Sequence, residues 1–323
     1  MAKRIRFVTN SQNYNRGSYR IWIHDLHNYF KQLHISSTIS NEIGLGGEEI
    51  IIVGKGETDL ARYIKQSYPD KKVGLINPVV DKYDFCDFLI VGSIEEQISL
   101  SQNKNVFLFP LIENLFQNVD VKDHTETDVI RFCFHGHYPH LAKFDPYVCE
   151  ALEKFSKQTN IELIIIHGNP EFNWEVGKPN IPIKFIQWDA KTIVNDILST
   201  DIGLSPNITH VTNYSRNQII DTGVYDTDYI IRFKNKSNAG RSFVYHQLGI
   251  PVVTDLTPSN LHILGDPDNG FIAGNTQSWL NAFQQLSSCK TRRVISRNAK
   301  IEFDRLYNPL LWARKLYKQL NGL

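Results

Sequence analysis

The chain has 323 residues, 41% of them hydrophobic and 21% charged, which is the balance of a folded globular protein and not of a disordered one. Its net charge of +1 argues against nucleic acid as the main partner, because such binding depends on a basic field. The length is generous for a single core and suits two α/β domains.

The four cysteines form no Cys-x-x-Cys pair, and none lies at zinc spacing from a histidine. We interpret them as buried, reduced thiols, and we expect no metal site. The apolar run at residues 5–9 is too short for a signal peptide, and no window reaches the roughly 20 apolar residues of a membrane span. We therefore expect a cytoplasmic protein, with at most a peripheral membrane contact.

Short apolar runs alternate with amphipathic stretches through the first half of the chain, a pattern typical of parallel sheets covered by helices. The runs predict strands at residues 5–9, 49–53, 73–76, 88–91 and 106–109, and the stretches predict helices at 18–33, 59–67 and 93–100. Residues 110–128 are polar and contain four acidic side chains between positions 120 and 128, so we interpret them as a linker.

The pattern restarts after the linker. It predicts strands at residues 130–134, 163–166, 183–186, 202–204 and 251–254, and helices at 146–157, 190–198, 276–286, 291–303 and 309–320. The sequence thus predicts two Rossmann-like, doubly wound domains, residues 1–127 and 128–323, with a ligand crevice between them. The last helix either covers its own domain or crosses back onto the first.

Polar residues follow the first predicted strand. Gly17 would let the backbone approach a ligand, and Ser18 would cap the following helix; an ordinary strand-to-helix turn explains them equally well. One turn into that helix, His24 and Asp25 are either a general base and its orienting carboxylate or two surface residues.

Three histidines, His135, His137 and His140, surround Gly136 just after a buried strand. They either contact a phosphate or sugar or are plain loop residues. A metal is the least favoured partner, because no carboxylate or cysteine follows at metal spacing. Asn260 follows the last strand, where its amide could bond phosphate or sugar hydroxyls.

The most informative segment is KSNAGRSFVYHQLGIPVV at residues 236–253, in which a Gly-x-Pro turn links a predicted helix to a buried strand. Lys236, Ser237, Asn238 and Arg241 cluster where the helix should begin. A helix N-terminus has free N–H groups and a positive dipole, so this cluster predicts a diphosphate site; a solvated basic loop is the alternative.

This segment resembles the donor region of glycosyltransferases with the GT-B fold, most closely family 4. Further motifs match that family in the same order: CDFLIVGS at 86–93, DIGLSP at 201–206, GIPVV at 249–253, the pair Asn269-Gly270 with Trp279, and RRVISRNA at 292–299. The resemblance implies a nucleotide-diphosphate sugar as donor and a carbohydrate or glycolipid as acceptor, without a separate cofactor. It also implies that the first loop, with Gly17, faces the cleft and that Trp188 lies near the nucleobase.

The chain departs from the family at two places. The Glu-x7-Glu pair that precedes the Gly-x-Pro turn in many members is replaced by Lys236 and Val244. The family's Gly-Arg after the first strand of the second domain is Gly136-His137, and a histidine binds phosphate more weakly than an arginine. We expect a metal-independent glycosyltransferase; a nucleotide-sugar epimerase and an inactive, transferase-like binding protein are the alternatives.

Overall fold

A computed structural model describes residues 3–42, 44, 46–78, 83–100, 105–137, 139–142, 146–168, 173–175, 177–207, 238–265 and 267–323. The chain forms two compact units. The first combines Met1–Gln117 with Tyr307–Leu323, and the second is Asn118–Leu306.

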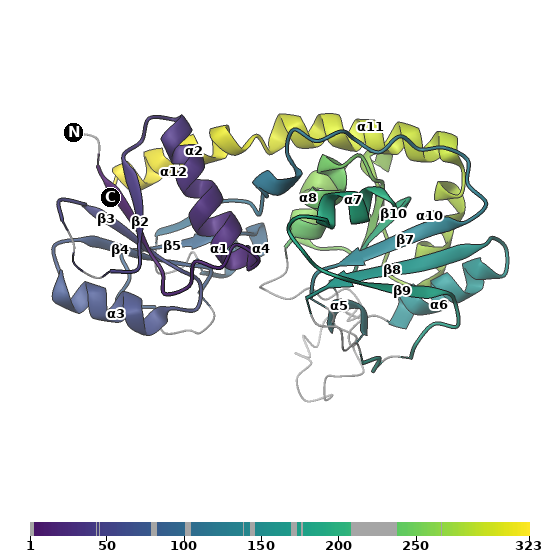
Figure 1. Ribbon diagram of the computed structural model, residues 1–323, viewed down its shortest axis with the longest axis horizontal. Coiled ribbons are helices and arrows are strands. Elements are labelled where there is room, and N and C mark those ends of the chain that lie inside the picture. Colours follow the sequence, from purple (N-terminus) through teal and green to yellow (C-terminus); the bar gives the residue numbers. More distant parts are fainter. Residues whose placement is uncertain are drawn as a thin grey trace, which may run out of the picture. The chain divides into compact units, whose positions relative to one another are not determined.

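The first unit contains a parallel sheet of six strands in the order β2-β1-β3-β4-β5-β6 (Figure 1). The strands are β1 (Ile5–Val8), β2 (Ser37–Ser40), β3 (Ile50–Val53), β4 (Lys72–Ile76), β5 (Phe88–Val91) and β6 (Asn105–Leu108). In β3 and β5 every side chain is buried, which is the pattern of parallel strands covered on both faces.

Helices cover both faces of this sheet. One face packs against a continuous helical segment and against the last helix, α12 (Pro309–Asn321). That segment comprises α1 (Gly17–Tyr19), the π-helix η1 (Arg20–Asp25) and α2 (Leu26–Gln32). The other face packs against α3 (Thr58–Ser67) and the end of α4 (Ile94–Leu100). The short 3-10 helix η2 (Asn114–Phe116) follows β6.

The second unit contains another parallel six-stranded sheet, in the order β12-β11-β10-β7-β8-β9 (Figure 1). Its strands are β7 (Ile130–His135), β8 (Ile161–His167), β9 (Ile183–Gln187), β10 (Ile202–Ser205), β11 (Val252–Thr254) and β12 (Phe271–Ile272). Its helices are α5 (Pro139–Ala142), α6 (Pro146–Ser156), α7 (Ile193–Leu198), α8 (Gly240–Gln247), α9 (Pro258–Leu264), η5 (Pro267–Asn269), α10 (Thr276–Leu286) and α11 (Cys289–Leu306).

The two faces of β7 and β10 serve different helices. Phe132, Phe134 and Leu204 lie in the core formed with α6 and α10. Because strand side chains alternate in direction, Gly203 faces the other way, toward α8. A Cβ atom on Gly203 would lie 2.5 Å from the ring of Tyr245, and the Tyr245 hydroxyl donates to the Cys133 carbonyl at 2.6 Å. Glycine at this position therefore lets α8 approach the sheet closely.

The boundaries of the units differ from the predicted division at residue 127. Residues 118–127 belong to the second unit, and Tyr307–Leu323 belongs to the first. Ala313, Leu316 and Leu320 of α12 are buried in the core of the first unit, so the last helix crosses back. The edge strands β2 and β12, the short helix α9 and the π-helical geometry of η1 had no counterpart in the prediction.

Candidate functional site

The topology of the second sheet marks one place for a ligand. From β7 the chain adds β8 and β9 on one side, and then it returns to place β10 on the other side of β7. The switch point therefore lies between β7 and β10, where open α/β sheets bind ligands at the carboxyl ends of the strands. These ends are His135 and Ser205. The register pairs Gly203 with Cys133, which puts both ends at the same level.

Arg241 reaches this switch point from the first turn of α8. Its Nη2 donates to the Pro206 carbonyl at 2.9 Å and to Asn207 Oδ1 at 2.7 Å, which fixes the guanidinium beside the end of β10. The guanidinium carbon lies 5.3 Å from the centroid of the Phe134 ring. A Cβ atom on Gly136, whose φ is +102°, would lie 3.8 Å from the arginine side chain. The positive φ, which favours glycine, lets the chain turn after β7 within contact distance of the arginine side chain.

Three polar atoms around the switch point are shielded from solvent and have no hydrogen-bond partner in the described part of the chain. They are His135 Nε2, Ser205 Oγ and Arg241 Nε. Burial lowers the pKa of His135 to about 3 and that of Arg241 to about 10, so at neutral pH the imidazole is neutral and the guanidinium is charged. Unsatisfied buried polar groups are rare in folded proteins, and an arginine N–H and a serine hydroxyl are donors suited to an anion.

Asn260 was predicted to contact phosphate or sugar, and the structure contradicts this. The side chain is fully buried. Its Nδ2 donates to Thr254 Oγ1 at 2.6 Å, and its Oδ1 accepts a hydrogen bond from Ser242 Oγ at 2.9 Å. Both ends of the amide therefore tie α8 and α9 to the end of β11, and neither is left for a ligand.

The remaining candidates of the second unit lie as follows. Asn238 Oδ1 accepts a hydrogen bond from the Gly240 N–H at 3.1 Å and so shapes the start of α8. His137 follows β7, with its ring 6.1 Å from that of His140. Trp188 follows the edge strand β9 and is only half-buried, so it is not a core residue. Lys236 and Ser237 lie outside the described residues.

The first unit places its candidates in the helical segment after β1. Gly17 begins α1, and His24 and Asp25 end the π-helix η1. Asp25 is fully buried, which rules out the surface alternative for this residue. His24 Nδ1 lies 3.0 Å from Asp25 Oδ1, and its side chain is 36% exposed. Segments of π-helix are rare and occur often at functional sites. The two residues thus have the arrangement of a base and its orienting carboxylate.

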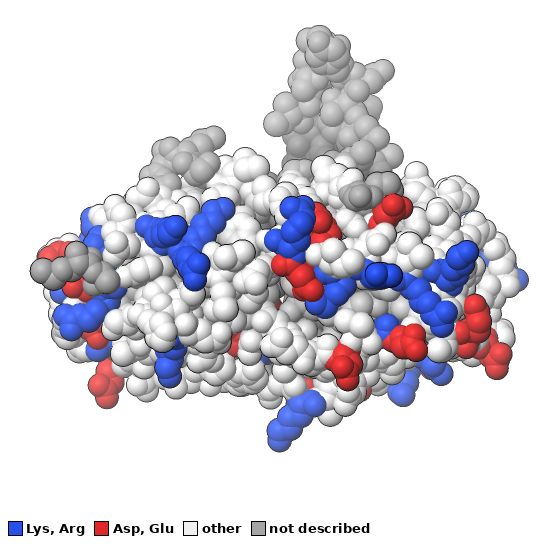
Figure 2. Space-filling view, turned by 90° about the horizontal axis from the view of Figure 1, so that it is seen from above, with Lys and Arg blue, Asp and Glu red and all other residues white. Residues whose placement is uncertain are grey.

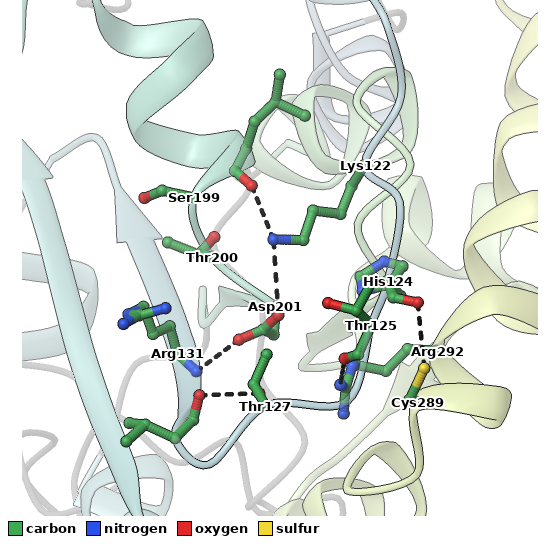
Figure 3. Close-up of polar contacts among 12 residues, drawn as sticks. Lys122, His124, Thr125, Thr127, Arg131, Ser199, Thr200, Asp201, Cys289 and Arg292 are labelled. Atoms are coloured by element: carbon green, nitrogen blue, oxygen red, sulfur yellow. Dashed lines mark hydrogen bonds and ion pairs between the residues drawn. The ribbon is translucent and has the colours of Figure 1, made fainter.

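Residues 118–128 belong to the segment 110–128 that the sequence suggested as a linker. They join the amino-terminal ends of the strands in the second sheet, opposite the switch point. The Lys122 ammonium donates to the Leu198 carbonyl at 2.9 Å and lies 3.7 Å from the carboxylate of Asp201 (Figure 3). Asp201 in turn accepts a hydrogen bond from the backbone N–H of Arg131 at 2.9 Å. Asp201 precedes β10 and Arg131 lies at the start of β7, so this network joins strand beginnings.

The same segment is attached to α11. Arg292, which is 1% exposed, donates to the Thr125 carbonyl at 3.1 Å, and Cys289 Sγ donates to the His124 carbonyl (Figure 3). His124 Nε2 lies 3.0 Å from the Gly249 carbonyl oxygen and donates to it, and burial lowers the pKa of the imidazole to about 4, so it is neutral at neutral pH. An open cavity of about 520 Å³ also lies at the amino-terminal ends of these strands, lined in part by Asn160 and Pro182. These groups support the fold at the edge opposite the switch point.

The described residues contain no group of three histidine, cysteine or acidic side chains arranged to hold a metal ion. Among the same residues, no helix has the length and apolar character that a bilayer crossing requires. On the face seen in Figure 2, basic and acidic side chains are interspersed. On α11, for example, Lys300 pairs with Asp304 at 2.7 Å and Arg305 with Glu302 at 2.8 Å.

Solved structures with the same architecture are sugar-transferring enzymes. Sucrose-phosphate synthase from Thermosynechococcus elongatus aligns with 99% of this chain and 100% of its own, with a TM-score of 0.64 and 11% identity. A glycosyltransferase from Rickettsia africae aligns over 99% of both chains, with a TM-score of 0.61 and 11% identity. Anabaena HepE, crystallised with UDP-glucose, covers 99% of this chain and all of its own at a TM-score of 0.60 and 13% identity.

The fold is GT-B-like. Neither a protein-family model nor a curated protein sequence matches the chain, so the likeness is one of architecture. The narrower resemblance to glycosyltransferase family 4 stays a prediction. Arg241 and the loop after β7, both candidates from the sequence, lie at the switch point of this fold, and so does Ser205, which the sequence did not single out. A ligand contact cannot be predicted from sequence for a buried serine at a strand end, because it depends on which strand lies beside it.

Proposed function

We propose that the protein transfers a sugar from a nucleotide-diphosphate sugar to an acceptor hydroxyl, and that the second unit binds the diphosphate. One observation carries this proposal: three shielded polar atoms, on His135, Ser205 and Arg241, lie at the switch point of the sheet without a hydrogen-bond partner among the described residues. The likeness to GT-B glycosyltransferases, including one crystallised with UDP-glucose, supports it.

The reaction requires stabilisation of the leaving group. The bond between the anomeric carbon and the diphosphate oxygen breaks, and the charge that develops on the leaving group needs preorganised donors. Arg241, Ser205 and the N–H groups at the start of α8 supply them. In this proposal these groups take the place of a metal ion.

The acceptor hydroxyl must lose its proton as its oxygen bonds to the anomeric carbon. We assign this proton to His24 Nε2. The Asp25 carboxylate holds the proton of Nδ1, so the lone pair that takes up the acceptor's proton is on Nε2, where the amide nitrogen of Asn28 lies 3.4 Å away. The carboxylate also stabilises the imidazolium that forms. Trp188, half-exposed after β9, is the proposed stacking surface for the nucleobase. Since structural neighbours were crystallised with UDP, uridine donors are the first to test.

The Arg241→Ala variant tests the donor site. Turnover with the best donor of a UDP-sugar panel should fall by at least about 10²-fold, because an oriented charge on the leaving group is lost. Arg297→Ala is the matched control, since Arg297 is exposed on α11. Circular dichroism and thermal unfolding would check that both variants fold.

Near-wild-type transfer by Arg241→Ala would refute the site. Incubation with donor alone would reveal an epimerase by the appearance of an epimer. Binding of UDP without transfer to any acceptor would indicate a protein that only binds the nucleotide.

A further inference from the structure

An ion pair between Arg20 and Glu113 lies next to the His24–Asp25 pair. Arg20, 3% exposed, donates through Nε and Nη2 to Glu113 Oε2 at 3.1 and 2.6 Å. Its Nη1 donates to the Tyr14 carbonyl at 3.0 Å. Arg20 and Asp25 belong to the same π-helix, whereas Glu113 comes from the loop after β6. The ion pair therefore joins that loop to the helix that carries the proposed base.

The same loop contacts Asp25 directly. The backbone N–H of Asn114, the residue after Glu113, donates to Asp25 Oδ2 at 3.1 Å. The other oxygen, Oδ1, faces His24 Nδ1 at 3.0 Å. Both oxygens of the Asp25 carboxylate are thus occupied, one by the histidine and one by the loop that the ion pair holds.

The charges of this cluster do not cancel. The carboxylate of Asp25 is fully buried, that of Glu113 is 15% exposed, and Arg20 is the guanidinium beside both. Burial raises the pKa of each carboxyl group, and the nearby Arg20 opposes that rise. The other titratable groups that face or neighbour the pair are Tyr14, Tyr19, His27 and Tyr29. Tyr14 and Tyr29 have a raised pKa and are neutral at physiological pH.

We infer that Arg20 and Glu113 are positioning residues that set the basicity of His24 by controlling the net charge around Asp25. The inference rests on the proposed role of His24. With Arg20, Glu113 and Asp25 all ionised, the cluster carries one net negative charge, and Asp25 Oδ1 presents it 3.0 Å from His24 Nδ1. Removing the Glu113 charge alone would bring the net charge of the cluster to zero, because Arg20 would then be balanced by Asp25.

The decisive experiment measures the pKa of His24 by NMR titration of the imidazole in the full-length protein. Glu113→Gln should lower it by roughly half a unit or more, because one negative charge close to the pair is lost. The double variant Arg20→Met/Glu113→Gln restores the original net charge and should return the pKa toward the wild-type value. Arg62→Met, on α3 and therefore on the other face of the sheet, is the control and should leave the pKa unchanged.

If Arg20 and Glu113 had a merely structural role, the pKa of His24 would deviate more from the wild-type value in the double variant than in the single one. An unchanged His24 pKa in folded Glu113→Gln would overturn the inference. If the double variant does not fold, the single variant decides. The pH profile of kcat/KM separates this inference from the proposed function. A shifted His24 pKa without a matching shift of the acid limb would remove His24 as the base and leave the charge control intact.

Discussion

His246 lies in the middle of α8 with its side chain fully buried, and neither ring nitrogen has a partner among the described residues. Burial lowers its pKa to about 3, and it also lowers those of His135 to about 3 and His124 to about 4. All three belong to the second unit. Each is neutral in the folded protein at neutral pH, whereas an unfolded histidine takes up a proton near pH 6.5.

The second unit should therefore lose stability as pH falls. The folded-state pKa lies below the unfolded value, so the proton binds the unfolded chain preferentially. The loss begins near pH 6.5 and continues toward pH 3 to 4, and at pH 5 it amounts to about 2 kcal/mol per histidine. Urea unfolding at pH 7.5 and 5.0 gives the loss of unfolding free energy between the two pH values. In His246→Leu this loss should be smaller than in the wild type by about that amount. His262→Leu, changed at an exposed histidine on α9, should keep the full difference.

The sequence alone was enough to pick out residues at the start of a helix, such as Arg241. It was not enough to predict which hydrogen bonds the neighbouring side chains form. Asn260 was expected at a ligand, but Ser242 and Thr254 take both ends of its amide, and these contacts join segments that only the fold brings together. The sequence left Asp25 either a surface or a catalytic role, but its side chain is completely buried and accepts a hydrogen bond from the N–H of Asn114, 89 residues away.

At the scale of elements, the contact between α8 and β10 holds the proposed donor site in place. Gly203→Ala would put a methyl group 2.5 Å from the Tyr245 ring and force α8 away from the sheet. We expect a loss of about 1–3 kcal/mol in unfolding free energy, as overpacked cores show. UDP affinity should fall as well, because Arg241 moves with the helix. Calorimetry with UDP and thermal unfolding measure the two effects.

Gly168→Ala is the matched change, because a Cβ atom there has no neighbour within 4 Å. It should alter neither quantity. Unchanged UDP affinity in a destabilised Gly203→Ala protein would separate the helix position from donor binding.

The long buried strands were predicted nearly residue by residue, since runs such as Ile50–Val53 and Phe88–Val91 are apolar throughout. Strand β2 was missed because Ser37–Ser40 is polar and lies at the sheet edge, where burial does not select apolar residues. Residues 118–127 looked like a linker for a related reason. Part of their attachment uses backbone groups, such as the Lys122 N–H that donates to the Leu248 carbonyl at 2.8 Å, and backbone groups leave no trace in composition.

At the scale of the whole molecule, α12 stabilises the first unit, although it follows the second unit in the chain. Leu316→Ala should cost about 2–5 kcal/mol, because Leu316 is 1% exposed in the core of the first unit. Leu311→Ala makes the same change on the same helix at a side chain that is 57% exposed, and it should cost less than about 0.5 kcal/mol. Hydrogen exchange resolved by segment would show whether the loss falls on the strands of the first unit, as expected, or on those of the second.

The discontinuous first unit has a consequence for biosynthesis. Residues 118–306 are contiguous, so they can assemble their sheet as soon as they leave the ribosome. The sheet that begins with β1 is translated earlier but must wait for Ala313, Leu316 and Leu320 before its apolar surface is covered. The nascent chain should thus complete its later-made half first, and the earlier half should depend on chaperones until translation passes α12.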